Sequence, residues 1–269
     1  LRLAAEYRQK LTQATVALSR DKTNEADQLV AGISAPEPNL EYANLYRTLG
    51  DWNAIGGRWQ QAADRFAVLV QVNQPDDWDV TTLDYLRYGP TLLEAGNVSG
   101  YEEFRRLAVE HFSKTINPVP AERVIKESLL MPASVDFLAA LQPLAETASN
   151  SLAVGPSPGE SMAAWRSFSL ALMEYRRGNY TGVEYWHQKS LGYKNSNDVR
   201  DATFQILLAM THYQLGEIGQ ARSELALGRQ RVEAWFNGLP TGTGEPGFWF
   251  DWVFARILLR EATALMKKS

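Results

Sequence analysis

The stretch from residue 43 to residue 72 constrains the fold more than any other, because two runs of helical periodicity flank a glycine-rich turn. In the first run, apolar side chains recur three or four positions apart, at Leu45, Leu49, Trp52 and Ile55. The second run has the same kind of spacing, at Trp59, Ala62, Phe66, Leu69 and Val72. Between the runs, Gly57 can adopt the left-handed backbone conformation that ends a helix. The stretch therefore predicts two helices folded into a hairpin.

The same hairpin carries a repeat motif. The pattern W-x2-L-G-x2-Y followed by A-x3-F corresponds here to Tyr46, Leu49, Gly50, Asn53, Ala62 and Phe66. Tyrosine replaces the tryptophan of the motif, and Asn53 replaces the second aromatic residue. The hairpin resembles a tetratricopeptide repeat (TPR), with the small residues Gly50 and Ala62 where the two helices are expected to cross closely.

Similar hairpins recur along the chain, and glycines mark their turns. Gly57, Gly96, Gly178 and Gly216 are separated by 39, 82 and 38 residues, so that the middle separation is about two periods. The sequence therefore predicts an all-α fold, an α-α superhelix of antiparallel hairpins in a single domain (1–269) that ends in a capping helix. We expect N-terminal helices (1–36), first-half repeats (37–152), a linker (153–160), second-half repeats (161–236), and a loop with the capping helix (237–269).

Prolines mark the weakest part of the repeat pattern. Helices are expected over residues 118–131 and 134–149, but this pair matches the motif poorly, and Pro143 is expected to kink the second helix. In the preceding helix pair, Tyr101 and Arg105 occupy the positions where Ala and Phe are expected.

Composition excludes several classes of function. The net charge is −4 without a cluster of Lys and Arg, which argues against a nucleic-acid partner. There is no cysteine, and no apolar run reaches the ~18 residues that cross a membrane, so neither disulfides nor membrane insertion is expected. The loop 241–244 lacks the Gly-Lys-Ser/Thr ending of a phosphate-binding loop, and we expect no cofactor. We read the chain as part of a longer protein, either cytoplasmic or the extracytoplasmic part of a membrane-anchored parent.

Three segments carry a more specific resemblance, namely GDWNAIGGRWQQAADRF, PAERVIKESLLMP and WFDWVFARILLREATALM. They are similar to the C-terminal TPR-like region of large bacterial multidomain serine/threonine protein kinases, over residues 42–269. The resemblance implies a bacterial signalling protein as the parent. The chain has none of the kinase motifs, so it is not expected to be an enzyme itself.

A TPR-like fold places the first helix of each hairpin on a concave surface that binds a protein or peptide. The candidates for this surface are Arg47, Asp51, Arg87, Trp165, Phe168, Leu172, Tyr175, Arg176, Ile206, Met210 and Tyr213. The competing interpretation is that the rings form the core between repeats. For Tyr175, Arg176 and Tyr213, which lie near helix ends, we expect the tips of the side chains to reach solvent.

Other titratable residues admit two interpretations each. His187 and His212 are expected to meet, either as a metal or acid/base pair or as a polar pair satisfied by hydroxyls. The acidic cluster of Asp76, Asp77, Asp79 and Asp84 binds a cation, or else Asp77 or Asp79 caps the next helix.

Two alternative functions stay open beside the interaction scaffold. A glycosidase-like enzyme on a helical scaffold needs two carboxylates in a cleft, and the candidates near apolar helix faces are Glu94, Glu127, Glu174 and Glu184. A structural self-association spacer would use exposed aromatic side chains such as Trp78 or Trp235.

Overall fold

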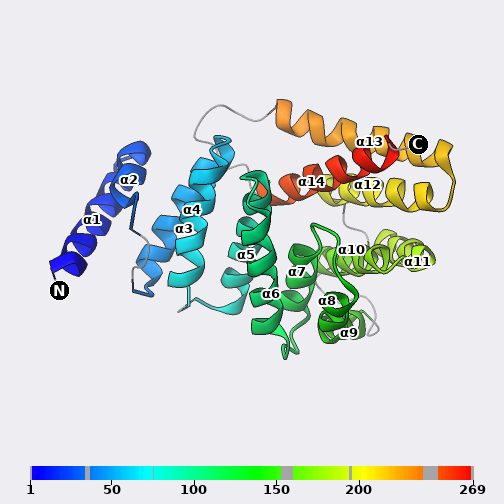
Figure 1. Ribbon diagram of the computed structural model, residues 1–269, viewed down its shortest axis with the longest axis horizontal. Coiled ribbons are helices and arrows are strands. Elements are labelled where there is room, and N and C mark those ends of the chain that lie inside the picture. The colour runs from blue at the N-terminus through cyan, green and yellow to red at the C-terminus, as the bar shows by residue number, and fades with distance from the viewer. Residues whose placement is uncertain are drawn as a thin grey trace. The chain divides into compact units, whose positions relative to one another are not determined.

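The structure is a computed structural model that describes residues 2–33, 37–74, 76–152, 160–193, 196–238 and 248–267. These residues form fourteen helices and no strand, which confirms the predicted all-α class (Figure 1). The expected linker (153–160), all but Glu160, and the loop 241–244 lie outside the described residues. Contacts divide the chain into two compact units, which we call unit 1 (Leu1–Val98) and unit 2 (Ser99–Ser269).

Unit 1 contains the first five helices, and consecutive helices pack against each other. Their bounds are α1 Arg2–Leu18, α2 Thr23–Val30, α3 Leu40–Ile55, α4 Trp59–Val72 and α5 Trp78–Glu94. Unit 2 contains the other nine helices. The first of them, α6, begins at the boundary between the units. Their bounds are α6 Val98–Phe112, α7 Pro118–Ser128, α8 Val135–Ala140, α9 Gln142–Ser151, α10 Glu160–Arg176, α11 Tyr180–Leu191, α12 Asp198–Gln214, α13 Ile218–Asn237 and α14 Trp249–Met266.

The α3–α4 hairpin is built from the motif positions that the sequence predicts. Tyr46, Leu49, Ala62 and Phe66 are completely buried between the two helices and their neighbours. The close crossing falls at Gly50, where an added Cβ would lie 2.3 Å from Cε1 of Phe66. The motif glycine is therefore required by the packing of the phenylalanine ring in the opposite helix.

Local backbone chemistry sets the helix ends. The four turn glycines all have positive φ, from 71° at Gly57 to 82° at Gly216, as the spacing predicts. At helix starts, the Asn39 side chain accepts a hydrogen bond from the N–H of Glu41, and Asp77 accepts from the N–H groups of Asp79 and Val80. These bonds satisfy donors that have no partner within the helix. Asp77 therefore caps α5. Helix capping was one of the two interpretations of the acidic cluster, beside cation binding.

Unit 2 contains two regular hairpins and a helix that covers them. Helix α10 packs against α11 and α12 against α13, while α14 packs against both α12 and α13 (Figure 1). Trp249, Phe254 and Ile257 are buried by this packing, and the Trp252 ring stacks on Trp235 at 5.4 Å between ring centres. The predicted covering role of the last helix is confirmed within unit 2.

The predicted kinked helix over residues 134–149 is wrong in one respect, because the chain forms two helices there. Helix α8 ends at Ala140 and α9 starts at Gln142, with Pro143 in the first turn of α9. Proline is tolerated in a first turn, where its missing N–H would have no helical partner. The proline thus starts a new helix rather than bending an existing one.

The Gly50 crossing gives a test of the hairpin. We expect Gly50→Ala to lower the free energy of unfolding by roughly 1–3 kcal/mol, because the methyl group forces the buried Phe66 ring to move. The matched control is Gly219→Ala in α13, where nothing lies within 4 Å of the added Cβ, so that stability should rise by up to about 1 kcal/mol. Urea denaturation followed by circular dichroism measures both. Equal stability of Gly50→Ala and wild type would contradict the close crossing.

Candidate functional site

Most of the apolar residues predicted for a concave surface on α10 and α12 lie in the core of unit 2. The buried members are Trp165, Phe168, Leu172, Ile206 and Met210. The Phe168 ring centre lies 5.1 Å from that of Phe204 and 5.8 Å from that of Phe254, in edge-to-face arrangements. For these five residues the competing interpretation, a core between repeats, is the one that the structure supports. They have too little exposed surface to anchor a partner.

The Arg176 side chain is also buried, contrary to the expectation that its tip reaches solvent. Its side chain is 3% exposed and forms a two-bond ion pair with Glu261 of α14. The same guanidinium donates to the carbonyl oxygen of Leu129, just beyond α7, at 3.0 and 3.1 Å. Arg176 therefore joins α10 to α7 and α14, and the prediction of a free surface arginine is wrong.

Tyr175 and Tyr213 are the predicted anchors of α10 and α12 that keep part of their surface exposed. Burial of the rest of the ring raises the pKa of Tyr175 to about 12. The Tyr180 ring lies 6.0 Å away. Tyr175 therefore keeps part of its surface accessible to a partner, although its titrating group is largely buried.

In unit 1, the structure brings the predicted residues Arg47, Asp51 and Arg87 together in an ion-pair network around Asp84. Arg47 donates to both carboxylate oxygens of the fully buried Asp84, at 2.7 and 2.8 Å, and to Asp76 at 3.0 Å. Arg87 donates to Asp51 at 3.1 Å and to Asp84 at 3.4 Å. The carboxylates of Asp76 and Asp84 are thus neutralised by arginines, which leaves little charge for the cation that their spacing suggested.

The two predicted histidines lie near enough for His212 to influence the pKa of His187, and each also has a partner of its own. His212 is buried, and its Nδ1 lies 2.6 Å from Oε2 of Glu224, a carboxylate rather than a hydroxyl. His187 packs its ring 5.0 Å from Phe204, and burial lowers its pKa. Among the described residues, no group of three or more His, Asp or Glu side chains is arranged to hold a metal ion.

The carboxylates named for an enzyme have structural partners. Glu174 accepts from the Asn179 side chain at 2.6 Å, and Glu184 lies 3.7 Å from Nε2 of His212. Glu127 is completely buried, with Oε1 unpaired, and burial raises its pKa to about 8. A protonated carboxyl is what a general acid requires, but a side chain without exposed surface cannot reach a substrate.

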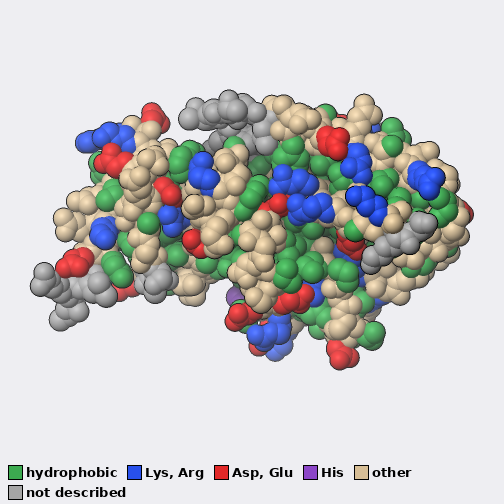
Figure 2. Space-filling model, turned by 45° about the horizontal axis from the view of Figure 1, so that its top comes forward, with side chains coloured by type: hydrophobic (Ala, Val, Ile, Leu, Met, Phe, Trp, Pro, Cys, Tyr) green, Lys and Arg blue, Asp and Glu red, His purple; other side chains and the backbone are tan. Residues whose placement is uncertain are grey.

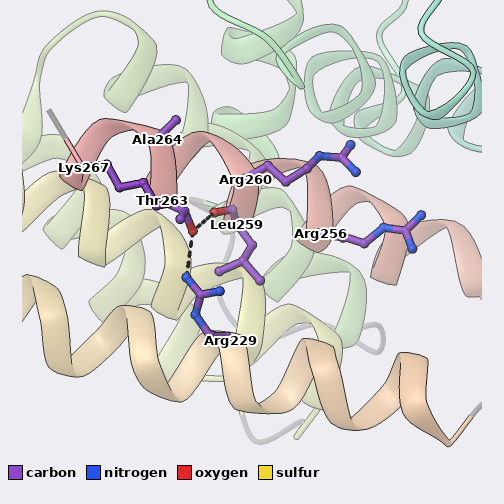
Figure 3. Close-up of a pocket in the computed structure, with 7 residues that line it drawn as sticks. All are labelled: Arg229, Arg256, Leu259, Arg260, Thr263, Ala264 and Lys267. Carbon is purple, nitrogen blue, oxygen red and sulfur yellow. Dashed lines mark hydrogen bonds between the residues drawn. The ribbon is translucent and has the colours of Figure 1, made fainter.

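A cleft of about 350 Å³ lies between α13 and α14, and the sequence analysis did not single it out. Its lining consists of Arg229 from α13 and of Arg256, Leu259, Arg260, Thr263, Ala264 and Lys267 from α14. Arg229 extends from α13 and donates to the Thr263 hydroxyl at 2.9 Å, and this hydroxyl donates to the Leu259 carbonyl at 2.7 Å (Figure 3). The two bonds hold one cation in place across the cleft.

Four of the seven residues around this cleft are cations and none is a carboxylate, but the surface that lines it is almost entirely apolar, so the side-chain stems and not the charged groups form the cleft. The Arg256 guanidinium lies 4.0 Å from the centre of the Phe236 ring, a cation–π contact that orients it. Glu233 approaches Arg229 from the rim at 3.6 Å and is largely exposed. Figure 2 shows Lys and Arg side chains gathered on the right-hand part of the drawn face, over the helices of unit 2.

A signal for this cleft was present in the sequence. Arg256, Arg260 and Lys267 are four and seven positions apart, which places them on one side of a helix. The partner cation Arg229 lies in the preceding helix, and periodicity alone does not indicate which faces of two helices meet. The net charge of the whole chain is negative, so composition alone does not indicate this local excess of positive charge.

No family model matches the chain, and no curated protein matches it. Among solved structures, the chain is similar to BtubC (BKLC) from P. vanneervenii, with a TM-score of 0.47 and 14% sequence identity, over 90% of this chain and 94% of that chain. No helix in the described parts of the chain has the length and hydropathy needed to cross a bilayer.

The buried carboxyl of Glu127 predicts a pH dependence of stability. The folded protein holds this proton up to pH about 8, whereas the unfolded chain releases it near the ordinary glutamate pKa of 4.5. The free energy of unfolding should therefore fall by roughly 1.4 kcal/mol per pH unit between these two values and level off outside them. Glu127→Gln removes this loss, so that the variant should gain on wild type as pH rises through this window.

The measurement is urea denaturation of both proteins at pH 4, 6 and 8. Glu103→Gln is the matched control, because it makes the same change on the exposed surface of α6 and leaves the Glu127 carboxyl in place. A constant difference between Glu127→Gln and wild type at all three pH values would show that this carboxyl does not hold its proton in the folded protein.

Proposed function

We propose that the chain is a non-catalytic protein-interaction module of the TPR type. The observation that supports the proposal is the α3–α4 hairpin, in which the motif residues Tyr46, Leu49, Ala62 and Phe66 are completely buried and Gly50 lies against the Phe66 ring, as expected for a TPR. Stacked helical hairpins present extended surfaces, and repeats of this kind typically bind other proteins. The resemblance of three segments to bacterial serine/threonine kinases supports a signalling protein as the parent.

On this proposal, the part-exposed residues Tyr175 and Tyr213 contact the partner. Tyrosine is frequent among interface anchors because it buries a large area at a low entropic cost. Arg176, which lies beside Tyr175 in the sequence, is not part of this surface, because its guanidinium is engaged with Glu261 and the carbonyl of Leu129. A substitution of Arg176 would disturb the fold and is unsuitable as a test of binding.

The experiment compares the double variant Tyr175→Ala, Tyr213→Ala with wild type. Partners are first captured from an extract of the source cells with the wild-type protein, identified, and produced in pure form. We expect the double variant to keep its circular dichroism spectrum and to bind the purified partner at least about tenfold more weakly, the size of a single interface hot spot. Isothermal titration calorimetry measures the affinity.

Tyr185→Ala is the matched control, because Tyr185 is an exposed tyrosine on α11, the second helix of the same hairpin as Tyr175. It should bind like wild type. Full affinity in the double variant would place the binding surface elsewhere. If no protein binds the wild-type chain directly, the interaction function itself is refuted.

A further inference from the structure

Three carboxylates surround one buried imidazole ring in unit 2. The ring belongs to His212, in the last turn of α12. Its Nδ1 lies 2.6 Å from Oε2 of Glu224 in α13. Its Nε2 lies 3.7 Å from Oε1 of Glu184 in α11 and 3.8 Å from Oε2 of Glu217, the N-cap residue of α13. The hairpins α10–α11 and α12–α13 therefore meet at a single titratable ring.

The neutral ring has a hydrogen-bond partner at each nitrogen. An ionised carboxylate only accepts hydrogen bonds, so Nδ1 carries the proton that Glu224 accepts. Nε2 is then an acceptor, and the amide nitrogen of Gln220, which only donates, lies 3.3 Å from it. Both partners belong to α13. Among the described residues, the neutral ring therefore makes no hydrogen bond to α11.

A second proton on the ring changes these contacts. The imidazolium donates from both nitrogens, so the Gln220 amide nitrogen loses its acceptor, whereas Glu184 and Glu217 become ion-pair partners of Nε2. The last turn of a helix favours a cation, because the helix dipole is negative at that end. The neighbouring His187 stays neutral at neutral pH, because burial lowers its pKa. The charged ring thus gains a contact with α11 that the neutral ring lacks.

The other helices that pack against α12 leave this ring alone. Arg176 of α10 pairs with Glu261 of α14. The remaining acidic residue of α14, Asp251, pairs with Lys126. Among the described residues, no hydrogen bond or ion pair connects α10 or α14 to His212. The charge of the ring is therefore coupled to carboxylates of α11, of α13 and of the turn before α13.

We propose that His212 is a proton-dependent contact between the two hairpins: protonation of Nε2 replaces the hydrogen bond from Gln220 by ion pairs to Glu184 and Glu217. The proton comes from solvent, which reaches the ring past the half-exposed side chains of Glu184 and Glu217. Histidine changes its charge between about pH 5 and pH 8, so the contact forms as pH falls through this range and is lost as pH rises. This inference goes beyond the proposed function, because the contact requires no partner.

The first measurement is nuclear magnetic resonance of the protein labelled with nitrogen-15 at its three histidines, at pH 8 and at pH 5. The variants His111→Gln and His187→Gln assign the signals. We expect the His212 ring to carry a proton on Nδ1 but not on Nε2 at pH 8, and on both nitrogens at pH 5. A proton on Nε2 at pH 8, or a ring that is still neutral at pH 5, would overturn the inference.

The second measurement is urea denaturation of Glu184→Gln at the same two pH values. Loss of this half-exposed ion pair should raise the equilibrium constant of unfolding about two- to fivefold at pH 5, and have little effect at pH 8, where the ring is neutral. Glu103→Gln is the matched control, because it removes the same charge from the exposed surface of α6. It should change the constant by the same small factor at both pH values. An equal effect of Glu184→Gln at pH 5 and pH 8 would overturn the inference, because the contact would then not depend on the proton.

Discussion

The packing of unit 2 depends on how the carbonyl groups at the end of α7 are satisfied. A helix leaves its last carbonyl oxygens without partners, and buried carbonyls without partners are costly. Here Tyr101 donates to the carbonyl of Glu127, Arg105 to that of Ser128, and Arg176 to that of Leu129. Tyr101 and Arg105 come from α6, whereas Arg176 comes from α10. Helix α7 can therefore end in the interior because two neighbouring helices supply its hydrogen bonds.

The same interaction explains where the sequence departs from the repeat motif. Tyr101 and Arg105 occupy positions where the motif proposed from the sequence has Ala and Phe, and both are buried at the end of α7. A motif residue at either position would fill space but donate no hydrogen bond. The departures at these two positions of α6 thus have a physical cause in the buried end of α7. What resembles a degenerate repeat is a helix pair adapted to a buried helix end.

Features determined by neighbouring residues could be predicted from the sequence, and contacts between distant helices could not. The turn at Gly57, the Asn39 cap and the core position of Phe66 follow from local backbone chemistry and helical spacing. The partner of Arg176 could not be predicted, because Glu261 lies 85 positions away and periodicity does not specify which buried polar groups meet. The cleft could not be predicted from the sequence for the same reason, since Arg229 and the residues that face it belong to different helices.

The contacts of Arg176 have a consequence for cooperativity. In a simple repeat array each hairpin contacts only its neighbours in sequence, so that terminal hairpins can open while the rest stays folded. Arg176 instead ties α10 to the end of α7 and to Glu261 of α14, over 47 and 85 positions of the chain. Opening α14 would leave a buried guanidinium without its carboxylate, which is unfavourable. We therefore expect α7, α10 and α14 to unfold in a single transition, unlike the gradual fraying of a linear array.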